Sequence, residues 1–425
     1  MMKTKIIGCL MLAAIAMTAS AQGGTNSPYS QYGLGVLNDR SQSASRGMNG
    51  VGIGLRQGSM ANTLNPASYS AVDSLTMIFD MGMAGQFTNF KEGSTRVNAK
   101  RASFEYAVGL FRAAKNVGVS FGVLPFSSVG YSYSGSSQYL KEFDTKVPAT
   151  YNGSGGLRQA FVGVGWRLLK PLSLGVNVAY LWGDYEHIVQ TSSVNNINAT
   201  KKTYSASVSS YNIDFGLQYE QPLSKRDVLT FGATVGLGHK LGADPEYQVQ
   251  VASNTATTYS VNDALEIPMS YGVGLSYNHD NRLTVAVDGT LQQWGDLKFP
   301  AFNSSSNQYE LTGGMLENRV QVNAGVDFVP DAVSLTSYLK RVHYRFGAGL
   351  TTPYYNIGGG DAPKELSVSI GLGLPIQNAY NNRSVLNISG QFVRSSSDRF
   401  ITENTFRINI GLTFNERWFA KWKVE

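Results

Sequence analysis

The stretch "LSLGVNVAYLW" (Leu172–Trp182) decides the fold class of this chain. Its even-numbered positions are large and apolar, and most of the positions between them are small or polar. Successive side chains of a β-strand point to opposite faces, so a period of two predicts a strand with one apolar face and one polar or small face.

The same alternation recurs along the chain, for example in "LTMIFDMGMAGQF" from Leu75 and "TFRINIGLTF" from Thr405. It predicts fourteen strands, near 75–90, 101–113, 116–126, 158–168, 172–187, 203–220, 227–242, 268–278, 282–294, 319–330, 342–352, 364–375, 383–393 and 402–414. Most of these segments are longer than the five or six residues usual for a strand in a soluble sandwich.

Short and long connections alternate between the predicted strands. "AAK", "LKP" and "HDN" are short, whereas 127–157, 188–202, 243–267 and 295–318 are long. Outer-membrane barrels have tight periplasmic turns and longer outer loops, so this alternation favours such a barrel. Two connections fit less well, because Asp331–Arg341 is too long and Arg394–Ile401 is too short.

A closed barrel also explains the polar residues within the predicted strands. In hydrocarbon every backbone N–H and C=O needs an internal partner, which a closed sheet supplies. The lumen then accepts polar side chains at Asp80, Asn212, Asp214, Asp288, Asn323 and Asp327. The predicted fold class is all-β, a transmembrane antiparallel β-barrel of about fourteen strands. A soluble all-β sandwich or propeller remains the alternative, because its inner faces also alternate.

The first 21 residues have the features of a secretory signal peptide. Lys3 and Lys5 precede the apolar stretch "IIGCLMLAAIAM", and "ASA" ends at Ala21, so the mature chain is expected to begin near Gln22. Cys9, the single cysteine, is expected to be removed with the signal, which excludes disulfides from the mature chain. No dense Lys/Arg block indicates nucleic-acid binding.

The motifs of catalysis and cofactor binding are not found. The Gly-rich stretch from Gly47 to Gly58 does not have the spacing or the flanking elements of a nucleotide loop. The four histidines are dispersed, and no G-x-S-x-G pattern occurs. We therefore expect no enzyme activity, no metal and no cofactor. The aromatic residues near strand ends suit interfacial girdles, with ligand contact as the alternative.

Pro125 lies at the end of the third predicted strand, in "GVLPFSSVGYSYSG". Because proline donates no backbone hydrogen bond, it belongs at an edge, a bulge or a strand end. Pro125 either simply ends the strand or breaks the pairing and opens the barrel wall.

The turn Asn65-Pro66-Ala67 follows a Gly-rich segment and directly precedes the first predicted strand. With the strand number and the length, it resembles the FadL/TodX (OMPP1) family of outer-membrane transporters, in which an N-terminal hatch precedes a fourteen-stranded barrel. The stretches "SPYSQYGLGVL" and "TFNERWFAKWKVE" look like the branch of that family found in Bacteroidota-type outer membranes.

The resemblance implies a signal peptide (1–21), a plug in the lumen (22–74), a barrel (75–414) and a periplasmic tail (415–425) in the outer membrane of a Gram-negative bacterium. It implies passive uptake of a fatty-acid-like or aromatic molecule, with lateral release at the third strand. The residues implied are a plug or gate at Asn65, Pro66 and Ala67, a lateral opening at Pro125, Ser127, Ser128 and Gly130, and ligand contacts at Tyr29, Tyr32, Leu34 and Leu64.

A second interpretation of the sequence gives the chain different partners. Some relatives handle proteins in outer-membrane machinery, such as the shuttle subunit of the type IX secretion system, so a protein-binding scaffold of a secretion or assembly machine is the alternative. The expected partners are outer-membrane lipid, a hydrophobic small molecule, other outer-membrane proteins and, during biogenesis, the barrel-assembly machinery. The last strand resembles the signal read by that machinery, at Phe406, Ile408, Ile410, Leu412 and Phe414. Beyond it, Trp418, Phe419 and Trp422 are expected at the membrane interface or on a partner.

Overall fold

A computed structural model of the chain describes residues 25–417 except 141–144, 194–197, 253, 304, 359–361, 377–383 and 398–399. The predicted signal peptide (1–21) and the tail residues Trp418, Phe419 and Trp422 lie outside the described residues. Within the described part, every helix is too short or too polar to cross a bilayer.

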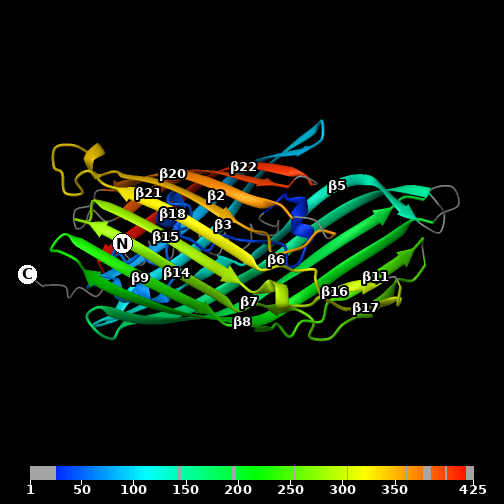
Figure 1. Ribbon diagram of the computed structural model, residues 1–425, viewed down its shortest axis with the longest axis horizontal. Helices are drawn as coiled ribbons and strands as arrows, with labels where there is room; N and C mark the ends of the chain where they lie inside the picture. Colours follow the sequence, from blue (N-terminus) through cyan, green and yellow to red (C-terminus); the bar gives the residue numbers. More distant parts are fainter. Residues whose placement is uncertain are drawn as a thin grey trace, which may run out of the picture.

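Fourteen antiparallel strands form a closed barrel, as predicted (Figure 1). In order around the wall they are β2 (Thr76–Glu92), β3 (Thr95–Ala114), β4 (Val117–Pro125), β6 (Thr145–Arg167), β7 (Leu172–Thr191), β8 (Thr200–Pro222), β9 (Asp227–Gly236), β14 (Ser270–His279), β15 (Leu283–Gln292), β18 (Arg319–Phe328), β19 (His343–Thr351), β20 (Lys364–Ile376), β21 (Ser384–Ser396) and β22 (Thr402–Arg417). The ladder between β2 and β22 closes the wall, pairing Thr76 with Arg417.

Several strand boundaries differ from the prediction, among them the start of β3 at Thr95 and the end of β9 at Gly236, and two further differences have a clear cause in the strand pairing. β22 continues to Arg417 instead of ending at Phe414, because it pairs along the whole of β2. β6 begins at Thr145, well before residue 158, because its first half pairs with a strand that the alternation did not reveal, β5 (Ser127–Leu140). The Gly-rich, hydroxyl-rich sequence of that region hides the apolar periodicity.

The outward face of the wall is apolar and the inward face is polar. On β20, Leu366, Val368, Ile370 and Leu372 are all exposed on the outer surface. In contrast, most of the polar strand residues that the alternation placed inside are buried, namely Asp80, Asn212, Asp288, Asn323 and Asp327. This arrangement is that of a transmembrane barrel with a polar lumen.

The wall is uneven in height. β6 and β8 have 23 residues each, whereas β14, β15 and β18 have 10. At the end with the long connections, β5 pairs with β6, and β11 (Glu246–Val251) pairs with β8. The connections there also contain β12 (Thr257–Ser260), the pair β10 (His239–Lys240) and β13 (Glu266–Ile267), η3 (Trp294–Asp296), and the pair β16 (Phe299–Asn303) and β17 (Gln308–Thr312). At the other, short-turn end, the long connection Asp331–Arg341 carries η4 (Leu339–Arg341).

We call residues Thr25–Ser74 the inner segment. It contains η1 (Pro28–Gln31), β1 (Val36–Leu37), α2 (Ser43–Gly47) and η2 (Pro66–Ala71), and most of its residues are buried. It packs against inward side chains of strands all around the wall, and it contributes to all three clusters of buried apolar residues.

Candidate functional site

The Asn65-Pro66-Ala67 turn fixes the inner segment near the short-turn end. Asn65 precedes η2, and its Oδ1 accepts the N–H of Ala67 at 3.1 Å, while Pro66 begins the 3₁₀ turn. The Asn65 Nδ2 donates to the carbonyls of Ile53 at 2.9 Å and Leu217 at 3.0 Å. One buried amide therefore caps the turn and ties it both to the inner segment and to β8.

Glycines of neighbouring strands form a cradle for this turn. A Cβ atom added at Gly175 would lie 2.3 Å from the carbonyl carbon of Pro66, and one at Gly118 would lie 1.9 Å from the carbonyl oxygen of Tyr69. The cradle glycines stand on four adjacent strands and are Gly118, Gly165, Gly175 and Gly216. Because backbone touches backbone here, no larger residue fits without displacing the turn.

Two wall carboxylates hold other parts of the inner segment. Asp80 on β2 accepts hydrogen bonds from the hydroxyl of Ser43 at 2.8 Å and from the hydroxyl of Tyr106 at 3.0 Å. The Oδ2 of Asp288 on β15 accepts the backbone N–H groups of Gly52 at 2.6 Å and Ile53 at 2.8 Å. The polar lumen residues predicted from the sequence thus serve to bind the inner segment.

Arginines of the inner segment pair with acids of the wall. Arg46 lies 3.0 Å from Glu105, and Arg56 lies 3.2 Å from Glu220. Burial, together with the nearby charge of Arg167, lowers the pKa of Arg56 to about 10. Arg56 therefore stays cationic at neutral pH and keeps its ion pair with Glu220.

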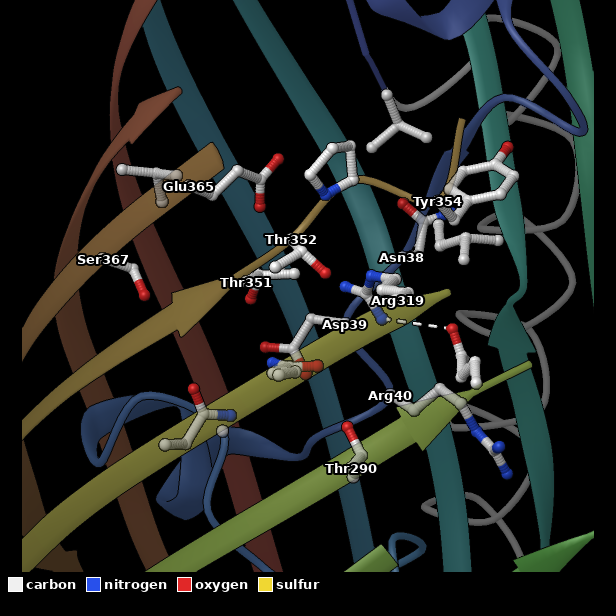
Figure 2. A pocket seen from close by; sticks show the side chains of 18 of the residues that line it. Asn38, Asp39, Arg40, Thr290, Arg319, Thr351, Thr352, Tyr354, Glu365 and Ser367 are labelled. Carbon is white, nitrogen blue, oxygen red and sulfur yellow. Dashed lines mark hydrogen bonds between the residues drawn. The ribbon is translucent and has the colours of Figure 1, made fainter. Parts of the chain in front are cut away.

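A cavity of about 330 Å³ lies between the inner segment and the wall (Figure 2). Its lining includes charged groups of both signs, at Asp39, Arg40, Arg319 and Glu365, interspersed with hydroxyl and amide side chains. Pockets for apolar small molecules are lined predominantly by hydrophobic and aromatic side chains. This cavity is instead suited to water and polar groups.

A buried apolar cluster, the cap, packs at the long-connection end. It joins Leu34 of the inner segment to Trp294, Tyr354 and Tyr355 of the connections and to inward residues of the tall strands. The hydroxyl of Tyr354 donates to the carbonyl of Tyr32 at 3.2 Å. The cap therefore packs the start of the inner segment against the outer connections.

The wall is interrupted between β3 and β5, and we call this interruption the seam. β3 pairs with β4 only from Ala107 onward, whereas its first half pairs with β2 alone. β5 pairs with β6, and on its other side with β1 at Ser127 and Ser128. Among the residues that the structure describes, no ladder joins the first half of β3 to β5.

A β-bulge lies where the seam begins. Gly82 pairs with Tyr106 and Met83 pairs with Phe104, so Glu105 has no partner residue on β2. The bulge turns both Glu105 and Tyr106 toward the lumen, where Glu105 meets Arg46 and Tyr106 meets Asp80.

The residues predicted for a lateral opening all lie along the seam. Pro125 ends β4 opposite Arg158, and the next residues belong to β5. Ser127 and Ser128 pair with the inner segment through β1, and the Gly130 N–H donates to the hydroxyl of Ser30 at 3.1 Å. The inner segment thus covers the first residues of this edge.

The residues predicted to contact a ligand are separated. Tyr29 and Leu64 line the cavity, whereas Leu34 is buried in the cap, and Tyr32 stacks on Tyr355 beside the cap. On β22, Phe406, Ile408 and Ile410 are exposed on the outer face of the wall.

Sequence reasoning missed the side chains that bridge the seam. The guanidinium of Arg101 on β3 donates to the carbonyl of Thr25 at 2.7 Å, and the amide of Asn26 donates to the carbonyl of Lys100 at 3.4 Å. Nothing in the local sequence marks Arg101, because its role depends on a segment more than seventy residues away. Within the described part of the chain, no three His, Cys, Asp or Glu residues gather as a metal site would require.

The family of the chain is shown by a match that extends over its whole length. A family model described as BamG matches residues 1–425. The chain belongs to the BamG family. No curated protein matches the sequence.

Solved structures similar to this BamG-family chain share its barrel. The Ralstonia pickettii toluene transporter TbuX has a TM-score of 0.62 at 13% identity, covering 90% of this chain and 99% of TbuX. The Pseudomonas putida toluene transporter TodX has a TM-score of 0.62 at 15% identity, covering 91% of this chain and 100% of TodX. A Pseudomonas aeruginosa FadL homologue has a TM-score of 0.62 at 12% identity, covering 90% of this chain and 99% of the homologue. The fold is therefore of the FadL type, and the Bacteroidota branch stays a prediction.

Proposed function

We propose that this chain is a protein-binding scaffold, an integral outer-membrane subunit of the barrel-assembly machinery in a Gram-negative bacterium. The family name carries the prefix used for components of that machinery, which supports the partner class. The observation that carries the scaffold role is the occupied lumen, in which the inner segment is bound by wall residues and covered by the cap.

The chemistry of the lumen argues against an oily cargo. An apolar ligand gains about 0.8 kcal/mol for each CH₂ group that it buries in apolar surroundings. The cavity is lined instead by charged groups at Asp39, Arg40, Arg319 and Glu365. A hydrocarbon bound there would remove these groups from water, which costs free energy, and would gain little apolar contact in return. A scaffold needs no such gain, since its barrel serves as a rigid membrane anchor.

Purification from native outer membranes in mild detergent tests this proposal. We expect the tagged chain to co-purify in fixed stoichiometry with the central assembly barrel, and its depletion to lower the amounts of other outer-membrane barrels. A tagged barrel of similar size from the same membrane serves as the control. Recovery of the chain without protein partners, together with normal barrel amounts after depletion, would refute the scaffold role.

A second function, passive uptake of hydrophobic small molecules, is favoured by one observation, the seam. The wall is unpaired beside Pro125, Ser127, Ser128 and Gly130, where a ligand could leave sideways, and the similar solved structures include toluene transporters. In this function the Asn65-Pro66-Ala67 turn belongs to the plug. The test is uptake of toluene and of a fatty acid into proteoliposomes, compared with Tyr29→Ala and Leu64→Ala variants. Uptake no faster than in protein-free vesicles would refute this role.

A further inference from the structure

Within the described part of the chain, the seam leaves two strand edges without a ladder. On β3 the free edge runs from Thr95 to Tyr106, since β2 occupies the opposite edge over that whole length. On β5 it runs from Val129 to Leu140, beyond the two residues that pair with β1. Exposed strand edges are ready templates for pairing with another chain, and proteins normally cover them.

The hydrogen bonds of the inner segment identify the backbone groups that face the seam. Asn26 binds the carbonyl of Lys100, so the backbone groups of Lys100, and by the period of two those of Asn98 and Ala102, point into the seam. On β5 the N–H of Gly130 binds the hydroxyl of Ser30, which sets Ser132 in the same direction. Two rows of backbone N–H and C=O groups that belong to no β-ladder therefore face the seam.

The inner segment contacts both strands at the seam. The carbonyl of Thr25 accepts a hydrogen bond from Arg101 on β3 at 2.7 Å. A Cβ atom added at Gly130 on β5 would lie 2.3 Å from the same carbonyl oxygen. Thr25 thus contacts both strands, β3 through the Arg101 side chain and β5 at Gly130, although it forms a ladder with neither.

We infer that the seam is a β-augmentation site, which binds one extended segment of a partner polypeptide as an added strand between β3 and β5. This inference rests on the proposed scaffold function and names how that scaffold holds its partner. In β-augmentation, main-chain hydrogen bonds supply the affinity and the side chains of alternate residues supply the specificity. The pairing of β1 with Ser127 and Ser128 shows that the β5 edge already accepts a strand.

A polypeptide satisfies these edges better than a lipid tail does. The N–H and C=O groups of Ala102 and Ser132 gain partners from another backbone, whereas hydrocarbon offers none. The side chains of Asn98, Lys100 and Ser132 are exposed and polar, so an incoming segment meets the seam from the aqueous side. Partner binding would displace the side-chain hydrogen bonds of Thr25 and Asn26.

Proline substitution separates backbone recognition from side-chain recognition. Ala102→Pro and Ser132→Pro each remove one seam-facing N–H and leave the groups that bond to β2 or β6 in place, since edge strands tolerate proline. Ala102→Val and Ser132→Ala change the side chains and keep the N–H groups. In the co-purified complex, we expect the proline variants to lose about tenfold or more in partner affinity, and the controls to stay within about twofold.

Hydrogen exchange on the unmodified complex provides the second measurement and does not depend on how the variants fold. We expect the amides of Ala102 and Ser132 to exchange about tenfold or more slowly with the partner bound than in the isolated barrel. A photo-crosslinker at Ala102 should form adducts with partner residues.

Each contrary result overturns the inference. If the partner co-purifies but the amide exchange at Ala102 and Ser132 is unchanged, strand addition is wrong and the scaffold function stands. If the crosslinker captures acyl chains instead of polypeptide, the seam is a lipid exit. If no protein partner co-purifies, the inference fails together with the proposed function.

Discussion

The two ends of the inner segment are held in opposite ways. At the short-turn end, the backbone of η2 is pressed against glycines of β4, β6 and β7, and the side chains of Asn65 and Pro66 are pressed against Gly216 of β8. At the seam, Thr25 and Asn26 meet β3 mainly through hydrogen bonds from Arg101 and to Lys100.

This difference separates a structural contact from a replaceable one. The cradle fits a single occupant, because backbone atoms have no alternative rotamers and dense packing leaves no room. The seam uses side-chain hydrogen bonds, each of which contributes only about 0.5–1.5 kcal/mol net and could be exchanged for those of another partner. The proposed scaffold function would use both kinds of contact, one to keep the lumen filled and one to respond to a partner.

The largest expected effect comes from filling the cradle. In Gly175→Ala, the new Cβ would clash with the backbone of Pro66 and Ala67, and overpacking of this kind costs about 3 kcal/mol. We expect a marked loss of the heat-modifiable folded band on a semi-native gel. In the control Gly289→Ala, the Cβ would meet only Val273, at 3.9 Å, and should leave the band unchanged. Equal stability of the two variants would show that the cradle is not rigid.

Removing the Asn65 side chain, which binds the first turn of η2, should lower the stability slightly less. Asn65→Ala removes the hydrogen bonds to Ala67, Ile53 and Leu217 and leaves buried backbone groups without partners, so we expect a loss of about 2 kcal/mol. The thermal unfolding midpoint, followed by circular dichroism, measures the loss. Asn65→Asp keeps the bond to the N–H of Ala67 and should fall between Asn65→Ala and the unmodified chain.

At the seam, truncation should alter local opening more than global stability. Arg101→Ala removes the charged donor that binds the carbonyl of Thr25 and the Oδ1 of Asn26, and we expect a stability loss of about 1.5 kcal/mol. Hydrogen exchange of the peptide that contains Ser27–Ser30 should become faster. Lys100→Ala is the neighbouring control, since the Lys100 contact to Asn26 is made by its backbone. Unchanged exchange in Arg101→Ala would mean that other contacts hold this end.

The smallest effect is expected at Pro125. The seam follows from where β3 and β5 find their partners, so Pro125→Ala should change stability by no more than about 0.5 kcal/mol. The rate of hydrogen exchange of the Ala102 amide should also be unchanged. If Pro125→Ala instead slowed the exchange at Ala102, the proline itself would be keeping the two strands apart.

The strands of the wall could be predicted because each carries its own alternation. Leu172–Trp182 lies within β7, and thirteen further segments fell on the other wall strands. β5 escaped prediction although Val129, Tyr131 and Tyr133 alternate, because this alternation is short and glycine and serine fill much of the rest of Ser127–Leu140. The small hairpins of the long connections escaped for the same reason, because local polarity there indicates loops.

The candidate site was predictable only where a residue has a local role. Asn65 and Pro66 form a turn, and Pro125 ends a strand, so both features appear in the sequence. Of the cradle glycines only Gly165 stands in a Gly-x-Gly sequence, and what the cradle holds depends on the register between distant strands. Arg101 could not be found, because its partner Thr25 is set by the closed wall.

The cradle also bears on the order in which the molecule is made. At the level of Gly118, Gly165, Gly175 and Gly216, four consecutive strands contribute no side chains, so the wall has no interior of its own there. Those strands gain their inward packing only when the earliest part of the chain is already between them. We therefore expect the lumen to fill as the wall closes, and a chain without Thr25–Ser74 to form a less stable barrel.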